Sequence, residues 1–262
     1  MSKSKRFIWQ NKPVSVLKLI PNIITMVGLC IGFSAVRFAL DAKWEQAVLC
    51  TIVAAIVDAI DGKLARFLNA TSVFGAELDS LCDFINFGTA PVLVTYLWIF
   101  NDYSIKLISW GSILFFAVCM ALRLARFNTM SISAQENKAL RGFFVGIPAP
   151  AGGILALLPL ICEFDLSEYI GFSFRSHPMF LAFYQSIVAI LMASRIPTIS
   201  LKDISVSPHN LWLLMLCTAL IVISLFLYTW IILPIFGVLY LCSLPFTYLS
   251  AKKISASFVK NE

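Results

Sequence analysis

Long apolar stretches separated by short polar ones make up most of the chain, and this pattern predicts membrane-spanning helices. A span needs about 20 mostly apolar residues, because a helix rises about 1.5 Å per residue and the hydrocarbon core is about 30 Å thick. The apolar runs are continuous rather than alternating, which favours helices over the strands of a membrane barrel. Eight stretches meet the requirement: 17–39, 45–66, 77–100, 106–127, 148–165, 177–195, 209–229 and 231–251.

The composition agrees with an integral membrane protein. Hydrophobic residues make up 60% of the chain and charged residues 13%, against about 45–50% and about 25% in soluble domains. The expected fold class is therefore all-α, a polytopic transmembrane bundle of about eight spans. The seven cysteines lie in apolar segments without a CxxC pair, so we expect reduced packing residues rather than disulfides or a metal site.

The positive charges predict the orientation. With a cytoplasmic N-terminus and eight spans, 16 of the 20 lysines and arginines fall on the inner side. Because cytoplasmic loops carry an excess of Lys and Arg, both termini are expected in the cytoplasm of a cell (inner) membrane. The outer side keeps Arg37, Lys43, Lys106 and Arg175.

The first 16 residues mix basic side chains with Phe7, Ile8 and Trp9. Such a segment is typical of an interfacial helix on an anionic leaflet, and equally of a basic tail that only sets the topology. The sequence leaves both interpretations open.

One stretch at the predicted cytoplasmic ends of the second and third spans is unusually acidic. Asp58 and Asp61 are spaced i,i+3, and Asp79 and Asp83 are spaced i,i+4, so each pair projects from one face of its helix. Four carboxylates near a membrane would repel one another, and a divalent cation removes this repulsion. Carboxylate oxygens suit Mg²⁺, Mn²⁺ or Ca²⁺, so the pattern predicts one or two bound ions.

Small and basic residues between the acids indicate what the metal would act on. Gly62 and Ala65 leave room for a ligand beside the backbone, and Gly75 permits a turn or a close approach. Arg66 offers a planar donor fork for phosphate oxygens. Metals beside an arginine at a membrane surface suit phosphoryl transfer on a lipid-linked substrate.

These residues resemble the signature of the CDP-alcohol phosphatidyltransferases. The match reads Asp58-x2-Asp61-Gly62-x2-Ala65-Arg66-x8-Gly75-x3-Asp79-x3-Asp83, with every fixed position and gap present. The resemblance covers roughly the first six spans. It implies a six-span catalytic core over 17–200, preceded by the basic segment 1–16 and followed by two additional helices and a basic tail over 201–262.

The family transfers a phosphatidyl group from a CDP-linked lipid to an alcohol and releases CMP, so the resemblance implies roles for single residues. Asp58, Asp61 and Asp79 would bind Mg²⁺ or Mn²⁺, while Asp83 would join a second ion and act as general base. The nucleotide and diphosphate would contact Gly62, Ala65, Arg66, Ser72 and Gly75. Asn22 and Thr25, in "PNIIT", resemble the family's N-terminal nucleotide-contacting segment, although "PN" alone is also a helix-start signal.

Three further stretches resemble the branch of this family that uses serine. They are "DSLCDFINFGTAP" from Asp79, "RLARFN" from Arg123 and "FVGIPAPAGG" from Phe144. Asn86 stands where that branch carries serine. The Pro and Gly cluster of the third stretch shapes the acceptor pocket or simply places Pro in the first turn of a helix.

Two arginines at the cytoplasmic end of the fourth span are candidates for binding the acceptor. Arg123 and Arg126 share a helix face and could hold the carboxylate of serine or the phosphate of glycerol 3-phosphate; the alternative is anchoring at the head groups. Asn128 would bind the serine amino or carboxylate group, or only cap the helix.

The expected function is transfer of the phosphatidyl group from CDP-diacylglycerol to L-serine, in a homodimer surrounded by membrane lipids and without a nucleic-acid partner. One alternative is the same chemistry with glycerol 3-phosphate. An alternative of another class is a divalent-cation channel or transporter, because acids inside membranes often mark ion paths. That alternative predicts acids spread across the membrane depth, whereas these acids cluster on one side.

Overall fold

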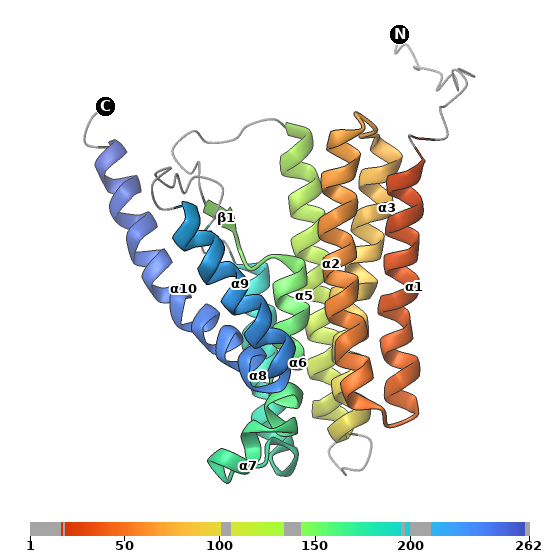
Figure 1. Cartoon of the computed structure of the whole chain (residues 1–262), viewed down its shortest axis with the longest axis vertical. Helices are drawn as coiled ribbons and strands as arrows, with labels where there is room; N and C mark the ends of the chain where they lie inside the picture. Colours follow the sequence, from red (N-terminus) through yellow and green to blue (C-terminus); the bar gives the residue numbers. More distant parts are fainter. Residues whose placement is uncertain are drawn as a thin grey trace.

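The computed structural model describes residues 17, 19–100, 106–133, 143–194, 197–199 and 211–259. Within these ranges nearly the whole backbone is helical, and a helix stands at each of the eight predicted positions (Figure 1). The predicted all-α class is thus confirmed. The basic segment 1–16 lies outside the described residues.

The helices follow one another with short connections. The first half contains α1 (Ile20–Leu40), α2 (Trp44–Phe67), α3 (Val73–Asp83), the π-helical turn η2 (Phe84–Thr89), α4 (Ala90–Thr95), the π-helical turn η3 (Tyr96–Phe100) and α5 (Lys106–Ser133). The second half contains α6 (Ala149–Phe164), α7 (Leu166–Ile170), the 3-10 turn η5 (Phe174–Ser176), α8 (Pro178–Ala193), α9 (Leu211–Leu227) and α10 (Thr229–Val259).

A two-stranded antiparallel ladder was not predicted. Strand β1 (Phe143–Val145) pairs with β2 (Pro197–Ile199), with Phe144 opposite Thr198. It ties the segment before α6 to the segment after α8. Strands of three residues lie below the length at which alternation can be recognised in a sequence.

Several described helices are long and apolar enough to cross a membrane. Four meet this requirement, Ile20–Leu40, Val73–Ile99, Leu107–Thr129 and Thr229–Thr247, and α6 and α8 are shorter apolar helices. Phe33, Leu107 and Phe183 are among many large apolar side chains that face outward, as expected of a lipid-facing surface. The chain is therefore a multi-pass membrane protein, while the number of eight crossings stays a prediction.

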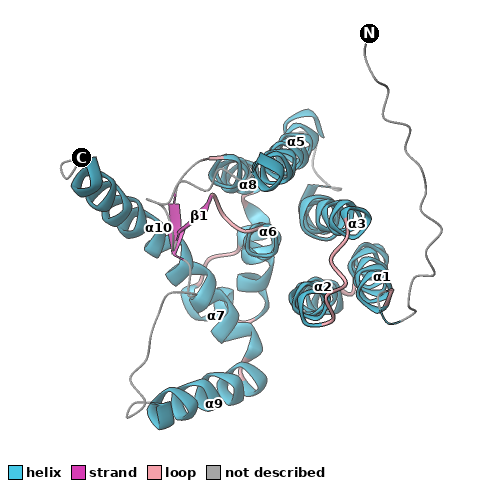
Figure 2. Cartoon of the chain, turned by 90° about the horizontal axis from the view of Figure 1, so that it is seen from above, coloured by secondary structure: helices cyan, strands magenta, loops and turns pink. Residues whose placement is uncertain are grey.

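Helix α6 lies at the centre of the bundle (Figure 2). Eleven of its 16 residues are buried, and it packs against α2, α4, η2, α8 and α10. A Cβ atom at Gly153 would lie 2.9 Å from the Phe87 Cα, so this glycine lets α6 approach the backbone of η2. Pro150 stands in the first turn of α6, which confirms one of the two interpretations of the Pro and Gly cluster.

The π-helical turn η2 follows Asp83 directly and contains Asn86. Single π-helical turns inside longer helices occur frequently at functional sites. Asn86 is only 3% exposed, and a Cβ atom at Gly32 would lie 2.1 Å from its Oδ1. Gly32 in α1 thus makes the space for the larger side chain that stands where serine was expected.

Candidate active site

Two neighbouring helices supply the four acids of the signature. Asp58 and Asp61 lie near the C-terminal end of α2, and Asp79 and Asp83 lie in the second half of α3. The Ser72 hydroxyl caps α3, accepting a hydrogen bond from the Gly75 N–H at 3.0 Å. This cap defines where α3 begins, and hence which face of the helix carries its acids.

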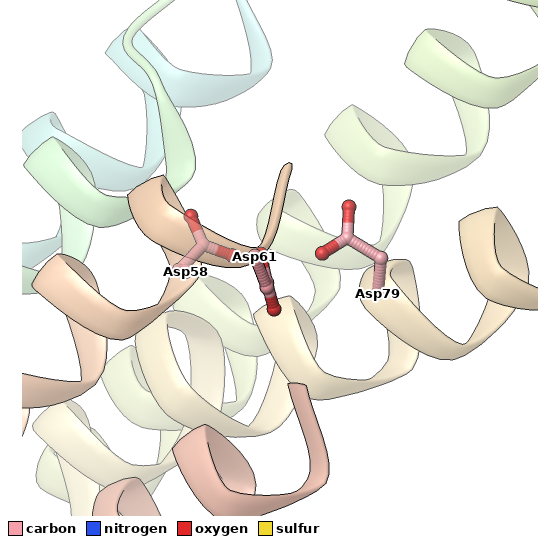
Figure 3. A group of neighbouring side chains, drawn as sticks. All are labelled: Asp58, Asp61 and Asp79. Carbon is pink, nitrogen blue, oxygen red and sulfur yellow. The ribbon is translucent and has the colours of Figure 1, made fainter. Parts of the chain in front are cut away.

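Three of the acids converge. One carboxylate oxygen each from Asp58, Asp61 and Asp79 lies within 4.8 Å of the other two, and Figure 3 shows the three side chains around a common space. The fourth, Asp83, lies within hydrogen-bonding reach of Asp58. The structure therefore joins all four acids into one group, called the acidic cluster below.

The acidic cluster has no contacting cation among the described residues. There, the ion pair within contact distance is Arg37–Asp41, at the far end of α1. Asp61 is only 3% exposed, and the Oδ1 atoms of Asp61 and Asp83 are buried without a hydrogen-bond partner. Buried carboxylates need a cation or donors, and hard oxygen ligands suit Mg²⁺ or Mn²⁺. The donor set thus fits a divalent metal.

Thr25 contacts the acidic cluster directly. Its hydroxyl donates a hydrogen bond to Asp61 Oδ2 at 2.6 Å, and it also lies 3.0 Å from the Pro21 carbonyl oxygen of its own helix. Thr25 was expected to contact the nucleotide, but here it orients a carboxylate. Sequence reasoning missed this contact because Thr25 and Asp61 are 36 positions apart and no local pattern links them.

Other predicted nucleotide contacts gather at the start of α3. A Cβ atom at Gly75 would lie 2.9 Å from Asn22 Oδ1 and 3.1 Å from Ser72 Oγ. Any side chain at position 75 would therefore displace both polar groups. Asn22, Ser72 and Gly75 form one polar group that joins α1 to α3, beside the acids.

The remaining small and basic residues of the signature line an open side of α2. A Cβ atom at Gly62 would meet nothing within 4 Å, and the exposed Arg66 side chain donates from Nε to the Gly62 carbonyl oxygen at 3.0 Å. Ala65 lies half-buried on the same helix. This surface is free for a ligand, with a guanidinium group held beside it.

The predicted acceptor residues are all engaged at the end of α5. Arg123 Nε donates to the Ile147 carbonyl oxygen at 2.7 Å, and Arg126 Nη1 donates to the Ala193 carbonyl oxygen at 2.8 Å. Asn128 pairs with Ser80 of α3 at 3.0 Å. Arg123 also interacts electrostatically with Asp83, so it is the arginine of the pair that belongs to the acidic cluster's surroundings.

Comparison with known proteins identifies the family. The family model of the CDP-alcohol phosphatidyltransferases matches residues 18–191, which is more than half of the chain. The chain belongs to the CDP-alcohol phosphatidyltransferase family. The resemblance found in the sequence is thereby confirmed, and the acidic cluster lies inside the matched region.

Relatives of this CDP-alcohol phosphatidyltransferase carry the name of one branch. The chain is 35% identical over 236 residues to the CDP-diacylglycerol–serine O-phosphatidyltransferase of Mycobacterium bovis, covering 88% of this chain and 78% of the relative. The Helicobacter pylori (strain J99) protein of that name is 32% identical, covering 70% and 73%. The Bacillus subtilis protein of that name is 30% identical, covering 69% and 89%.

Proposed function

We propose that this CDP-alcohol phosphatidyltransferase transfers the phosphatidyl group of CDP-diacylglycerol to the hydroxyl of L-serine, forming phosphatidylserine and CMP. The observation that carries the proposal is the convergence of Asp58, Asp61 and Asp79 beside Asp83. The serine acceptor is supported by the names of the relatives and by the two arginines next to the cluster. Cation transport has no such support, because the acids gather at one end of two helices.

A divalent ion held by Asp58, Asp61 and Asp79, with Asp83 beside them, would neutralise the diphosphate and stabilise the departing CMP. The chain's own part is to keep these carboxylates together and oriented. The helix end of α2, the cap of α3 and the Thr25 hydroxyl do this work. Mg²⁺ and Mn²⁺ both suit the oxygen donors.

Asp83 is the proposed general base. A serine hydroxyl is a poor nucleophile at neutral pH, and a positioned carboxylate that takes its proton accelerates such a reaction typically by 10²–10⁴-fold. One Asp83 oxygen is buried without a partner, so it is available to the incoming hydroxyl. The bond from serine oxygen to phosphorus forms as the bond from phosphorus to the CMP oxygen breaks.

The nucleotide end of the substrate is proposed to lie over Asn22, Ser72 and Gly75 and along the open side of α2. Gly62 and Ala65 leave room there, and the Arg66 fork points to phosphate oxygens. The acyl chains would stay in the bilayer. Arg123, with Arg126 and Asn128 beside it, would bind the serine end.

The proposed placement in the cell follows from the charge distribution. The active site and both termini would face the cytoplasm, because the basic residues cluster on that side. The family match at 18–191 lies within the proposed catalytic core of 17–200. The two helices that follow are proposed as an addition to that core, and the homodimer stays a prediction.

An acceptor assay tests the proposal. The purified protein is incubated with CDP-diacylglycerol, Mn²⁺ and labelled L-serine or glycerol 3-phosphate, and lipid products are separated. We expect labelled phosphatidylserine and stoichiometric CMP. Product from glycerol 3-phosphate without product from serine would replace the proposed acceptor, and no product from either would reject the activity.

Substitution of the arginine nearest the base is expected to act on the acceptor. Arg123→Ala should raise the KM for serine by about tenfold to hundredfold, since a hydrogen bond to a charged group is worth about 1.5–3 kcal/mol, and should change the KM for CDP-diacylglycerol little. Arg126→Ala should have a smaller effect, because its Nη1 is engaged by Ala193. Steady-state kinetics with each substrate varied measures both, and equal increases for both substrates would indicate a structural role.

Loss of the Thr25 hydroxyl is expected to weaken metal binding. Thr25→Val removes the donor to Asp61 Oδ2, and groups that orient metal ligands typically affect affinity by about 10–100-fold. The Mn²⁺ concentration for half-maximal activity should rise accordingly, while the KM for CDP-diacylglycerol at saturating Mn²⁺ stays constant. Thr51→Val is the matched control, since the Thr51 hydroxyl bonds only to Ala47 within α2. A raised nucleotide KM at saturating metal would restore the nucleotide-contact role.

A further inference from the structure

The last helix places a tyrosine beside the acceptor arginine. Helix α10 lies beyond the family match at 18–191 and packs against α6 and β2. Gly237 allows the close approach, since a Cβ atom there would lie 2.6 Å from Leu158 Cδ1 of α6. Tyr240 lies about one turn further along α10, on the part of the helix that this contact fixes in place.

The Tyr240 hydroxyl is buried without a partner. Its oxygen has almost no exposed surface and no hydrogen bond among the described residues. A buried hydroxyl that makes no hydrogen bond is destabilising, and such groups in native proteins call for an explanation. A ligand that accepts a hydrogen bond from this hydroxyl would supply one.

Arg123 links this hydroxyl to the proposed base. The Arg123 guanidinium interacts electrostatically with Tyr240 as well as with Asp83, and its Nε–H is held by the Ile147 carbonyl oxygen at 2.7 Å. The Nη groups make no printed bond within the described part of the chain, so they and the phenol hydroxyl are the donors at this place. Two donor groups, one of them cationic, form a site for an anionic group.

We propose that Tyr240 is a specificity-determining residue, whose hydroxyl donates a hydrogen bond to the carboxylate of the acceptor beside Arg123. The inference rests on the proposed transfer to serine. In this arrangement the acceptor hydroxyl lies at Asp83 and the acceptor carboxylate lies at Arg123 and Tyr240. The C-terminal pair of helices thereby gains a role: α10 completes the acceptor pocket of the six-helix core.

Tyr240→Phe tests the proposal, because it removes only the hydroxyl and keeps the ring in its packing. We expect the KM for serine to rise about tenfold or more, as for the loss of a hydrogen bond to a charged group. The KM for CDP-diacylglycerol and the affinity for CMP should stay within about twofold, since neither molecule carries a carboxylate. Tyr228→Phe is the matched control, an exposed tyrosine between α9 and α10, and should behave like the wild type.

Two outcomes overturn the inference. An unchanged KM for serine in Tyr240→Phe would mean that the hydroxyl meets only an ordered water, and equal losses for both substrates would mean a packing role. Both results differ from failure of the proposed function, in which the wild-type protein itself forms no phosphatidylserine. If the wild type uses glycerol 3-phosphate alone, the proposed carboxylate contact is rejected together with the serine acceptor.

Discussion

Asp83→Asn is expected to lower kcat for phosphatidylserine formation by about 10²–10⁴-fold, the usual contribution of a general base. The amide keeps the size of the side chain but cannot take the serine proton. Asp58, Asp61 and Asp79 remain to hold the metal, so CMP should still bind in the presence of Mn²⁺. Turnover is measured with labelled serine, and CMP affinity is measured by calorimetry on the same preparation.

The control for this substitution lies on the same helix. Glu77 in α3 is exposed, and Glu77→Gln makes the same change of charge without touching the acidic cluster, so its kcat should match the wild type. If Asp83→Asn retained kcat within about threefold, Asp83 would not be the base. If the variant lost CMP affinity to the same extent as turnover, its role would be in holding the metal.

Removal of the divalent ion is expected to abolish turnover, and Asp79→Asn should do nearly the same. Lewis-acid stabilisation is worth several kcal/mol, and each 1.36 kcal/mol is tenfold in rate, so losses of about a thousandfold or more follow. In the structure Asp79 is the residue of α3 that completes the group of three carboxylates. Chelation with EDTA should be reversed by added Mg²⁺ or Mn²⁺ in the wild type.

Direct metal binding separates this prediction from a general loss of activity. Titration of the chelated protein with Mn²⁺, followed by electron paramagnetic resonance, should give saturable binding in the wild type and in Glu77→Gln, and much weaker binding in Asp79→Asn. Full activity after exhaustive chelation would remove the metal from the proposed mechanism. Unchanged Mn²⁺ binding in Asp79→Asn would remove Asp79 from the ligand set.

Much of the fold could be predicted because membrane spans are encoded locally. A run of apolar residues of sufficient length must be a helix in a bilayer, since every backbone polar group has to be satisfied within the segment. The structure places helices at the predicted positions, although α5 reaches Ser133, six residues beyond the predicted end at 127. Charged residues at the ends of α2 did not prevent its prediction, because they lie in its terminal turns.

The tertiary contacts were out of reach of the sequence pattern. Nothing local indicates that Thr25 donates to Asp61, that Asn128 pairs with Ser80, or that Arg126 donates to the Ala193 carbonyl oxygen. Each joins residues tens of positions apart, and their side chains meet only because α1, α5 and α8 pack as they do. The same holds for Asn86, whose space depends on Gly32 in another helix.

The amino-acid sequence by itself determined that the protein is helical and membrane-embedded, and that each acid pair lies on one helix face, because hydrophobic length and helical periodicity are local properties. It also determined the family, through the spacing of eight residues from Asp58 to Asp83. Only the tertiary structure decided that the two acid pairs form one cluster, and that Tyr240 of α10 lies near Arg123. Those juxtapositions depend on how separate helices pack, which the three-dimensional arrangement of the whole chain sets.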